Sequence, residues 1–100
     1  MAPRAIIVTG ADSRQFRLSD LMLRSLHRHG VFRHYPIGFL DAGLTPEDRA
    51  RLPRAVQVAP AQWAFDFPTR AHYERRAPGL SMLSARIRAR ETFPGYDVYV

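Results

Sequence analysis

The sequence lacks cysteine, lysine and any long apolar run, and each absence excludes a class of protein. Without cysteine there are no disulfides and no cysteine-based zinc sites, which fits a reducing compartment. The longest apolar runs, such as Ala5 to Val8, are far shorter than the roughly 20 residues of a membrane helix. The N-terminus also lacks the apolar region of a signal peptide. We therefore expect a cytoplasmic protein with no membrane segment in this stretch.

Positive charge is plentiful, but arginine alone carries it. The formal net charge is +6, and the arginines are spread from Arg4 to Arg90 without a block of five or more. A basic surface is what nucleic-acid binding requires. The complete absence of lysine, however, indicates a compositional bias of the genome and not a selected phosphate-binding surface. We expect no nucleic-acid partner. The alternative, a basic nucleic-acid-binding protein, predicts an affinity for nucleic acid that falls steeply as the salt concentration rises.

The composition is that of one folded domain. With 46% hydrophobic and 24% charged residues, the chain is close to the average for globular proteins, so disorder is not favoured. A chain of 100 residues can bury one core. We expect residues 1–100 to form a single domain.

Four apolar stretches predict strands. A strand covered on both faces reads as a continuous apolar run, and the first run ends at Gly10. The others follow Pro36, follow Pro53 and follow the Pro94–Gly95 turn. The predicted strands are Ala5–Thr9, Ile37–Leu40, Val56–Val58 and Tyr96–Val100.

Three stretches predict helices. The first runs from about Leu18 to a left-handed cap at Gly30. Thr45 is an N-cap for the second, which begins at Pro46 and ends near Leu52. The third is predicted over 81–92, capped by Ser81. The apolar stripe of the first helix is expected at Leu18, Leu21, Met22, Ser25, Leu26 and His29; that of the third is expected at Leu80, Leu83 and Ile87.

The remaining stretch, Ala59 to Gly79, holds three prolines and predicts an irregular or partly helical excursion. Its aromatic residues Trp63, Phe65 and Phe67 make it too apolar for a free linker, and we expect them to anchor this excursion to the core.

The alternation of strands and helices predicts an α/β fold, a Rossmann-like three-layer αβα arrangement with a mostly parallel central sheet. In such sheets ligands bind beyond the carboxyl ends of the strands, where the strand order reverses. We expect Ala5–Thr9 and Tyr96–Val100 to be parallel neighbours at the sheet centre. The strand order should reverse between them, so the ligand site is expected there.

Four segments together resemble the N-terminal portion of a GT-A type nucleotide-diphospho-sugar transferase: "VTGADSRQF", "LDAGLTPEDRARL", "FDFP" and "SARIRARETFPGYDVYV". The likeness spans nearly all of the chain. In that family the strand corresponding to "YDVYV" runs into an Asp-x-Asp motif that holds a divalent metal against the sugar-nucleotide pyrophosphate. The resemblance therefore implies an incomplete GT-A fold that stops just before this motif.

The resemblance also implies a nucleotide-binding site. Thr9, Ala11 and Asp12 match positions that meet the base and ribose, and Arg86 resembles a basic residue that faces the diphosphate. Gly10, beside Ala11, would let a flat base approach the backbone closely. The implied partners are a nucleotide-sugar donor and an unknown acceptor, and the implied cofactor is Mn²⁺ or Mg²⁺, whose ligands would lie after residue 100.

Several of these candidate residues also have a plainer reading, in which their role is purely structural. Asp12 and Ser13 could cap a helix, Arg86 could be solvated, and Asp41 is expected to terminate a strand and not to act in catalysis. His27 and His29 point about 200° apart on a helix, so they cannot bind one metal from one face. A small non-catalytic α/β binding or interaction module is the alternative to a glycosyltransferase.

Overall fold

The computed structural model describes residues 4–100. Its elements in chain order are β1 (Ala5–Ala11), α1 (Phe16–Arg28), the 3₁₀ turn η1 (Val31–Arg33), β2 (Ile37–Asp41), α2 (Pro46–Ala50), β3 (Val56–Pro60), α3 (Arg70–Arg76), α4 (Leu80–Ala85), the 3₁₀ turn η2 (Arg86–Arg88), α5 (Ala89–Thr92) and β4 (Val98–Tyr99). The predicted alternation of strands and helices is confirmed.

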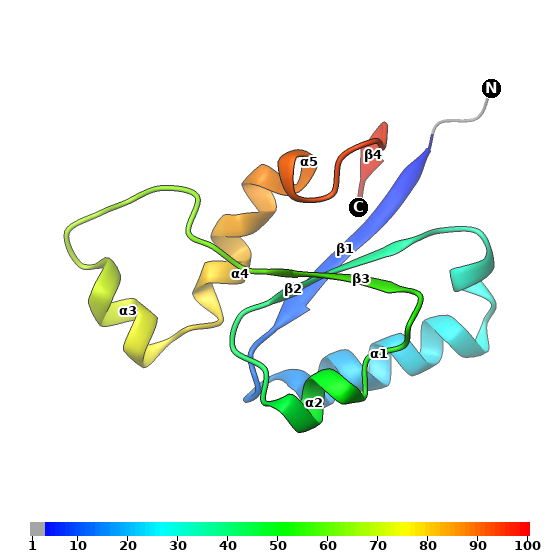
Figure 1. Cartoon of the computed structure of the whole chain (residues 1–100), viewed down its shortest axis with the longest axis horizontal. Coiled ribbons are helices and arrows are strands. Elements are labelled where there is room, and N and C mark those ends of the chain that lie inside the picture. Colours follow the sequence, from blue (N-terminus) through cyan, green and yellow to red (C-terminus); the bar gives the residue numbers. More distant parts are fainter. Residues whose placement is uncertain (1–3) are drawn as a thin grey trace.

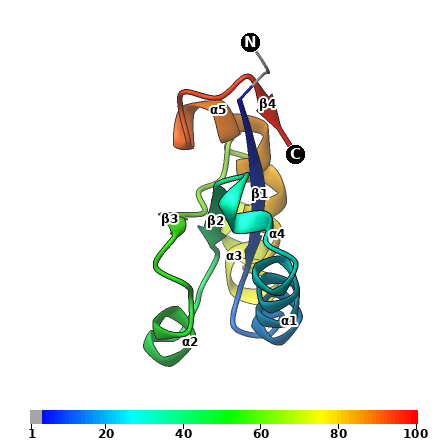
Figure 2. The ribbon, with the colours of Figure 1, turned by 90° about the vertical axis from the view of Figure 1, so that its right-hand side faces the viewer.

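The four strands form one parallel sheet in the order β3-β2-β1-β4. Ile7 is paired with Ile37 on one side of β1, and Ala5 is paired with Val98 on the other. Both ribbon views show β4 beside the first half of β1 (Figures 1 and 2). The α/β class and the parallel pairing of the first strand with the last are therefore confirmed, and the strand order reverses between β1 and β4. The expected place of the last strand at the sheet centre is wrong: β1 is central, but β4 is the edge strand of the described sheet and spans Val98–Tyr99 in place of the predicted Tyr96–Val100.

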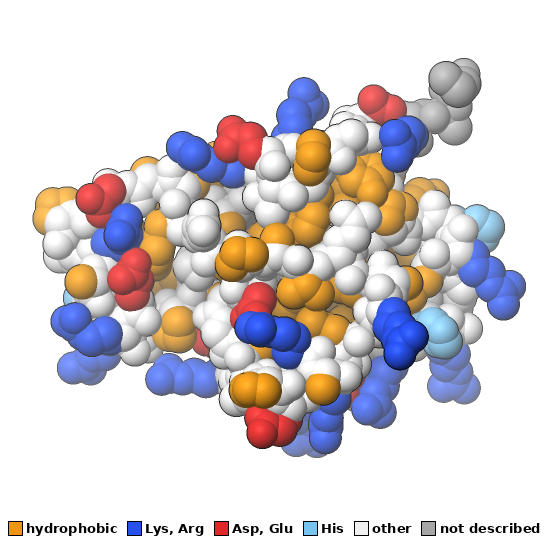
Figure 3. Space-filling view, in the orientation of Figure 1, with side chains coloured by type: hydrophobic (Ala, Val, Ile, Leu, Met, Phe, Trp, Pro, Cys, Tyr) orange, Lys and Arg blue, Asp and Glu red, His pale blue; other side chains and the backbone are white. Residues whose placement is uncertain are grey.

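The sheet separates two helical layers. α1 and α2 lie on one side, and the α4 to α5 segment lies on the other (Figure 1). Because side chains alternate along a strand, Ile7 and Ala11 of β1 face α1 whereas Ile6 and Val8 face α4 and α5. The molecule is thin, with extents of 44 × 31 × 16 Å. On the face drawn in Figure 3 hydrophobic atoms occupy the middle and arginines lie around the rim.

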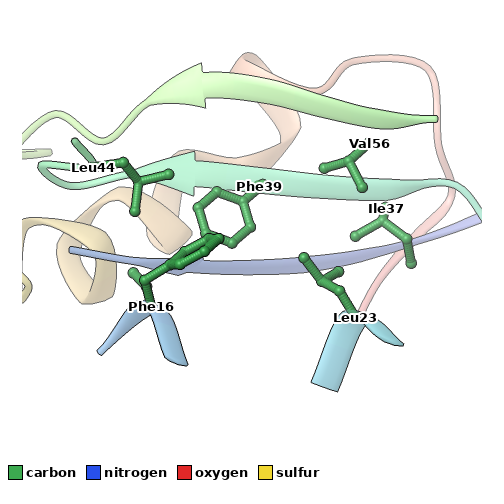
Figure 4. Close-up of a cluster of buried hydrophobic side chains, with 7 residues drawn as sticks. Phe16, Leu23, Ile37, Phe39, Leu44 and Val56 are labelled. Carbon is green, nitrogen blue, oxygen red and sulfur yellow. The ribbon is translucent and has the colours of Figure 1, made fainter. Parts of the chain in front are cut away.

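The core beneath α1 is built from large side chains. Phe39 is fully buried and meets Phe16 edge to face, with 6.5 Å between ring centroids. Leu23, Ile37 and Val56 point into the same space (Figure 4). Burial of one such side chain stabilises the fold by about 1.5–3 kcal/mol.

The core beneath α4 and α5 depends on close contact between these helices and the strands. A Cβ on Gly38 would come within 2.9 Å of the Phe93 ring, and one on Gly10 would come within 2.5 Å of Met82 Cγ. Apart from Met82, which fills the space beside Gly10, the segment 80–92 presents small side chains to the sheet, at Ser81, Ala85 and Ala89. Glycines on the strands and small residues on the helix thus allow the two layers to pack closely.

Two local signals act as expected. Gly30 has the left-handed φ of 75° and follows the last turn of α1. The Thr45 hydroxyl accepts a hydrogen bond from the Asp48 N–H at 3.2 Å, with Pro46 in the first turn of α2. The end of α1 and the start of α2 are therefore determined by residues that are close to them in the sequence.

The prediction of which residues form the buried face of α1 is wrong in part. Leu18 and Leu21 are 72% and 56% exposed, and the helix instead buries Phe16, Ser19 and Leu23. The helix begins at Phe16, whose aromatic ring packs on Phe39, and this contact fixes the rotation of the helix.

The predicted single helix over 81–92 is broken into α4, η2 and α5. Ser81 does not cap it: the helix begins at Leu80, and the Ser81 hydroxyl donates to the Pro78 carbonyl at 2.8 Å. The stripe of Leu80, Leu83 and Ile87 exists but points away from the sheet, because the opposite face of the segment, with its small side chains and Met82, packs against the strands.

The excursion between β3 and α4 is partly helical, as predicted, and contains α3. Its aromatic rings pack on one another, with 5.2 Å between the centroids of Trp63 and Phe67 and 6.1 Å between those of Phe67 and Tyr73. These rings belong to neither core cluster, so they do not anchor the excursion as expected. The Ala64 N–H, which donates to the Ser84 hydroxyl at 2.8 Å, ties the excursion to α4.

Candidate functional site

A hollow of about 260 Å³ lies at the carboxyl end of β1, the end at which ligands bind in parallel sheets. The loop after β1 forms one wall, and the connection from α3 to α4 forms the other. The lining residues are Asp12, Arg14, Gln15, Arg76, Ala77, Gly79, Leu80, Met82 and Leu83. The hollow thus combines one carboxylate, two arginines and an apolar wall.

Asp12 is held in place by the turn that starts α1. Its side chain Oδ1 accepts a hydrogen bond from the Gln15 N–H at 3.1 Å, and the residue is only 5% exposed. The other oxygen, Oδ2, accepts no hydrogen bond from residues 4–100. A Cβ at position 79 would lie 3.2 Å from Oδ2, so Gly79 leaves room beside it. Asp12 therefore holds the turn that precedes α1, but it is not the helix N-cap that the plainer reading expected, because that position is Gln15 and has no side-chain capping bond. Its other oxygen offers a free acceptor to the hollow.

Two arginines supply the positive charge of the hollow. Arg14 Nη1 donates to the Arg76 carbonyl at 3.2 Å, which joins the two walls. Neither guanidinium forms an ion pair with a carboxylate of residues 4–100. Both side chains are exposed, so they can bind an anion without breaking an ion pair.

The loop after β1 is fixed to the loop after β2. Ser13 donates its N–H to the Gly43 carbonyl at 3.1 Å, and its hydroxyl accepts from the Thr45 N–H at 2.8 Å. These bonds hold the wall that carries Asp12 and Arg14.

Asp41, the last residue of β2, organises that second loop. Its Oδ1 accepts from the N–H groups of Gly43 and Leu44 at 2.9 and 2.8 Å, and its Oδ2 pairs with Arg49. Burial alone would raise the pKa of Asp41, but the bonds from Leu44, Gly43 and Arg49 outweigh it and hold the pKa below its ordinary value. The carboxylate terminates the strand as expected, and its acceptors are already occupied.

The structure brings only one of the sequence-predicted site residues to the hollow. Thr9, Gly10 and Ala11 lie inside β1, which extends two residues further than predicted because these residues stay paired with β2. Thr9 and Ala11 face the α1 layer, and the space beside Gly10 is filled by Met82. Arg86 is exposed on η2, three residues and about one turn beyond Leu83, the last residue that lines the hollow. A nucleotide-binding role for these four residues stays a prediction.

Sequence reasoning missed the two arginines of the hollow, Arg14 and Arg76. Arg14 directly follows Asp12 and Ser13, so its place after the first strand was a usable signal. Arg76 lies in the excursion, 64 residues after Asp12 in the chain, and only the tertiary fold brings it there.

Two more hollows, of about 390 and 420 Å³, adjoin one another between α1 and α2 and share Asp20, Arg24 and Arg51. In the part of the chain that the structure describes, no three His, Asp or Glu side chains group as metal ligands would. Within residues 4–100 no helix is both long and apolar enough to span a bilayer.

Fold and hollow together define a parallel α/β protein with a polar crevice at the carboxyl end of its central strand. Comparison of the chain with protein-family models, curated proteins and solved structures gave no match.

Proposed function

We propose that this chain is the nucleotide-sugar-binding part of a cytoplasmic GT-A type glycosyltransferase, which transfers a sugar from a nucleotide donor to an acceptor. The observation that supports the proposal best is the hollow at the carboxyl end of β1. It lies beyond the carboxyl end of β1, the central strand beside which the strand order reverses. It combines the free Oδ2 of Asp12 with Arg14 and Arg76, neither of which forms an ion pair with residues 4–100.

Each group of the hollow has a chemical task in this proposal. Asp12 Oδ2 accepts a hydrogen bond from a ribose hydroxyl or from a base N–H. Arg14 and Arg76 bind phosphate oxygens and offset the charge that grows on the departing diphosphate. Leu80 and Met82 provide an apolar wall for the flat base. Arg86, on the next turn of the same segment, is the further candidate for the diphosphate that the family resemblance suggests.

The resemblance implies Mn²⁺ or Mg²⁺, but residues 4–100 do not provide a site for it. Divalent cations of this kind need several oxygen ligands, and no such group of side chains occurs in the described part of the chain. The roles above therefore use only the side chains of the hollow.

Titration with uridine and guanosine diphosphates by isothermal calorimetry tests the proposal. We expect measurable binding by the unaltered chain, and a roughly tenfold weaker Kd in Arg76→Gln, because a charged hydrogen bond to phosphate is lost. Asp12→Asn keeps the oxygen that accepts from Gln15 and removes the free acceptor, so we expect a similar loss there. The parent nucleosides, which lack phosphate, should not distinguish Arg76→Gln from the unaltered chain.

Arg33→Gln is the matched control, since Arg33 is exposed on η1 near the start of β2, at the far end of the sheet. Equal affinities in all variants would remove the site. If no diphosphate binds at all, the chain fits the non-catalytic α/β module better. A loss in Arg86→Gln but not in Arg76→Gln would favour the site suggested by the resemblance over the hollow.

A further inference from the structure

The outward face of the segment 80–92 carries its largest apolar side chains. Leu80, Leu83 and Ile87 are 37%, 56% and 75% exposed. The opposite face packs on the sheet and consists of Met82 and the smaller Ser81, Ser84, Ala85 and Ala89. We call the three exposed side chains the apolar ridge. Leaving them in water costs free energy that burial against a partner would recover.

Arginines flank the ridge. Arg86 is three residues after Leu83 and Arg90 is three after Ile87, a spacing that places helical neighbours side by side. Neither arginine forms an ion pair with any of residues 4–100. The single acid of this segment, Glu91, instead lies 3.8 Å from Arg88. The surface is therefore aliphatic in the middle and positive at its margin.

The opposite layer offers an internal comparison. Leu18 and Leu21 are also exposed on α1, but Arg24 beside them is paired with Asp20 at 3.2 Å. That face has one aliphatic side chain fewer, and part of its charge is neutralised. The two surfaces lie on opposite sides of the sheet (Figure 1), so one flat partner cannot cover both.

We propose that the apolar ridge docks on the surface of an anionic lipid bilayer. Leu83 and Ile87 enter the boundary between headgroups and acyl chains, and the arginines keep their charges among the phosphates while their stems lie along the apolar surface. The cytoplasmic leaflet is anionic and attracts such a surface. A second copy of the chain fits less well, because three side chains cover far less than the roughly 800 Å² per partner of a stable interface.

The inference does not depend on nucleotide binding. It has a consequence for the hollow, however, because Leu80 and Leu83 belong to both. Docking of the ridge would bring the hollow next to the lipid surface, where an acceptor carried by a lipid could reach it.

Co-sedimentation with vesicles tests the docking. We expect the chain to bind vesicles of equal parts phosphatidylcholine and phosphatidylglycerol, and to bind pure phosphatidylcholine much more weakly. Leu83→Ser with Ile87→Ser should lower binding about tenfold, because the inserted aliphatic area is lost. Arg86→Gln with Arg90→Gln should lower it about 25-fold, since each basic residue near such a surface contributes about fivefold.

The matched control is Leu18→Ser with Leu21→Ser, which should bind as the unaltered chain does. All changed residues are exposed, so circular dichroism should show the same fold in every variant. Absence of binding to anionic vesicles would overturn the proposal, as would an equal loss in the α1 control. Two other outcomes would also overturn it: binding that needs the arginines but not the ridge, or a dimer in sedimentation velocity that disappears with Leu83→Ser and Ile87→Ser.

Discussion

Gly10→Ala is expected to destabilise the fold by about 3 kcal/mol, the largest effect of any single substitution considered. The added Cβ would lie 2.5 Å from Met82 Cγ and 2.6 Å from the Leu40 carbonyl oxygen. Met82 is a flexible side chain and can move, but the carbonyl belongs to the neighbouring strand and cannot move without disturbing the ladder. Denaturant unfolding followed by circular dichroism measures the loss.

Two further substitutions make this measurement specific. Met82→Ala in the Gly10→Ala background should recover only part of the loss, because the contact with Leu40 remains. Gly30→Ala is the control: nothing lies within 4 Å of its Cβ, so its cost is the left-handed backbone alone, about 1 kcal/mol. If Gly10→Ala proved no more costly than Gly30→Ala, the close packing of α4 on β1 would be wrong.

This expectation also bears on the candidate site. Gly10 was predicted to give a nucleotide base access to the backbone, but Met82 occupies the space that its missing side chain leaves. Loss of nucleotide binding in Gly10→Ala would therefore result from the disturbed packing and not from a lost contact between Gly10 and the base. Asp12→Asn and Arg76→Gln are the variants that test the hollow.

Asp41→Ala is expected to have the second largest effect, a loss of about 2 kcal/mol. The carboxylate is 9% exposed, and it accepts from two backbone N–H groups as well as from Arg49. Its removal leaves the N–H of the buried Leu44 without an acceptor, and such a buried unsatisfied group costs about 1–3 kcal/mol, whereas water can replace the lost partner of the exposed Gly43 and Arg49. Asp41→Asn keeps an oxygen for the two N–H groups and loses only the partner of an exposed arginine, so we expect a loss of about 1 kcal/mol or less. Equal losses in the two variants would show that the backbone bonds are not the main contribution.

The pH dependence of stability follows from the same carboxylate. Because the pKa of Asp41 is lowered in the folded state, its contribution is complete above the unfolded pKa of about 3.9 and is lost as the pH falls through the lower folded value. The unaltered chain should therefore lose its advantage over Asp41→Asn as the pH decreases below about 4. An advantage that stays constant down to pH 2 would contradict the lowered pKa.

Local sequence signals were sufficient for much of the fold. The apolar run after Arg4, the cap at Thr45 and the left-handed Gly30 each depend on a few neighbouring residues, and the elements they predict are present. Alternation of these elements then restricts the topology to a parallel sheet, because parallel strands need helical crossovers. The place of the candidate site, at the carboxyl end of the first strand, follows from this topology.

The composition of that site could not be predicted in the same way. Asp12 was found because it follows a strand, whereas Arg76 joins it from a distant excursion whose path no local pattern determines. The prediction of which helix faces are buried was wrong for a related reason. Periodicity shows that Leu80, Leu83 and Ile87 share a face, but it does not show which face meets the sheet.

The sequence by itself thus determined the class of fold, the order of its elements and the strand end where a ligand site belongs, because these depend on contacts between near neighbours. Tertiary structure alone decided which helix faces are buried and which arginines stand beside Asp12. The physical reason is steric: Gly10 and Gly38 leave room for Met82 and for the Phe93 ring, and this close fit fixes the rotation of the segment 80–92, so that Leu80, Leu83 and Ile87 point outward.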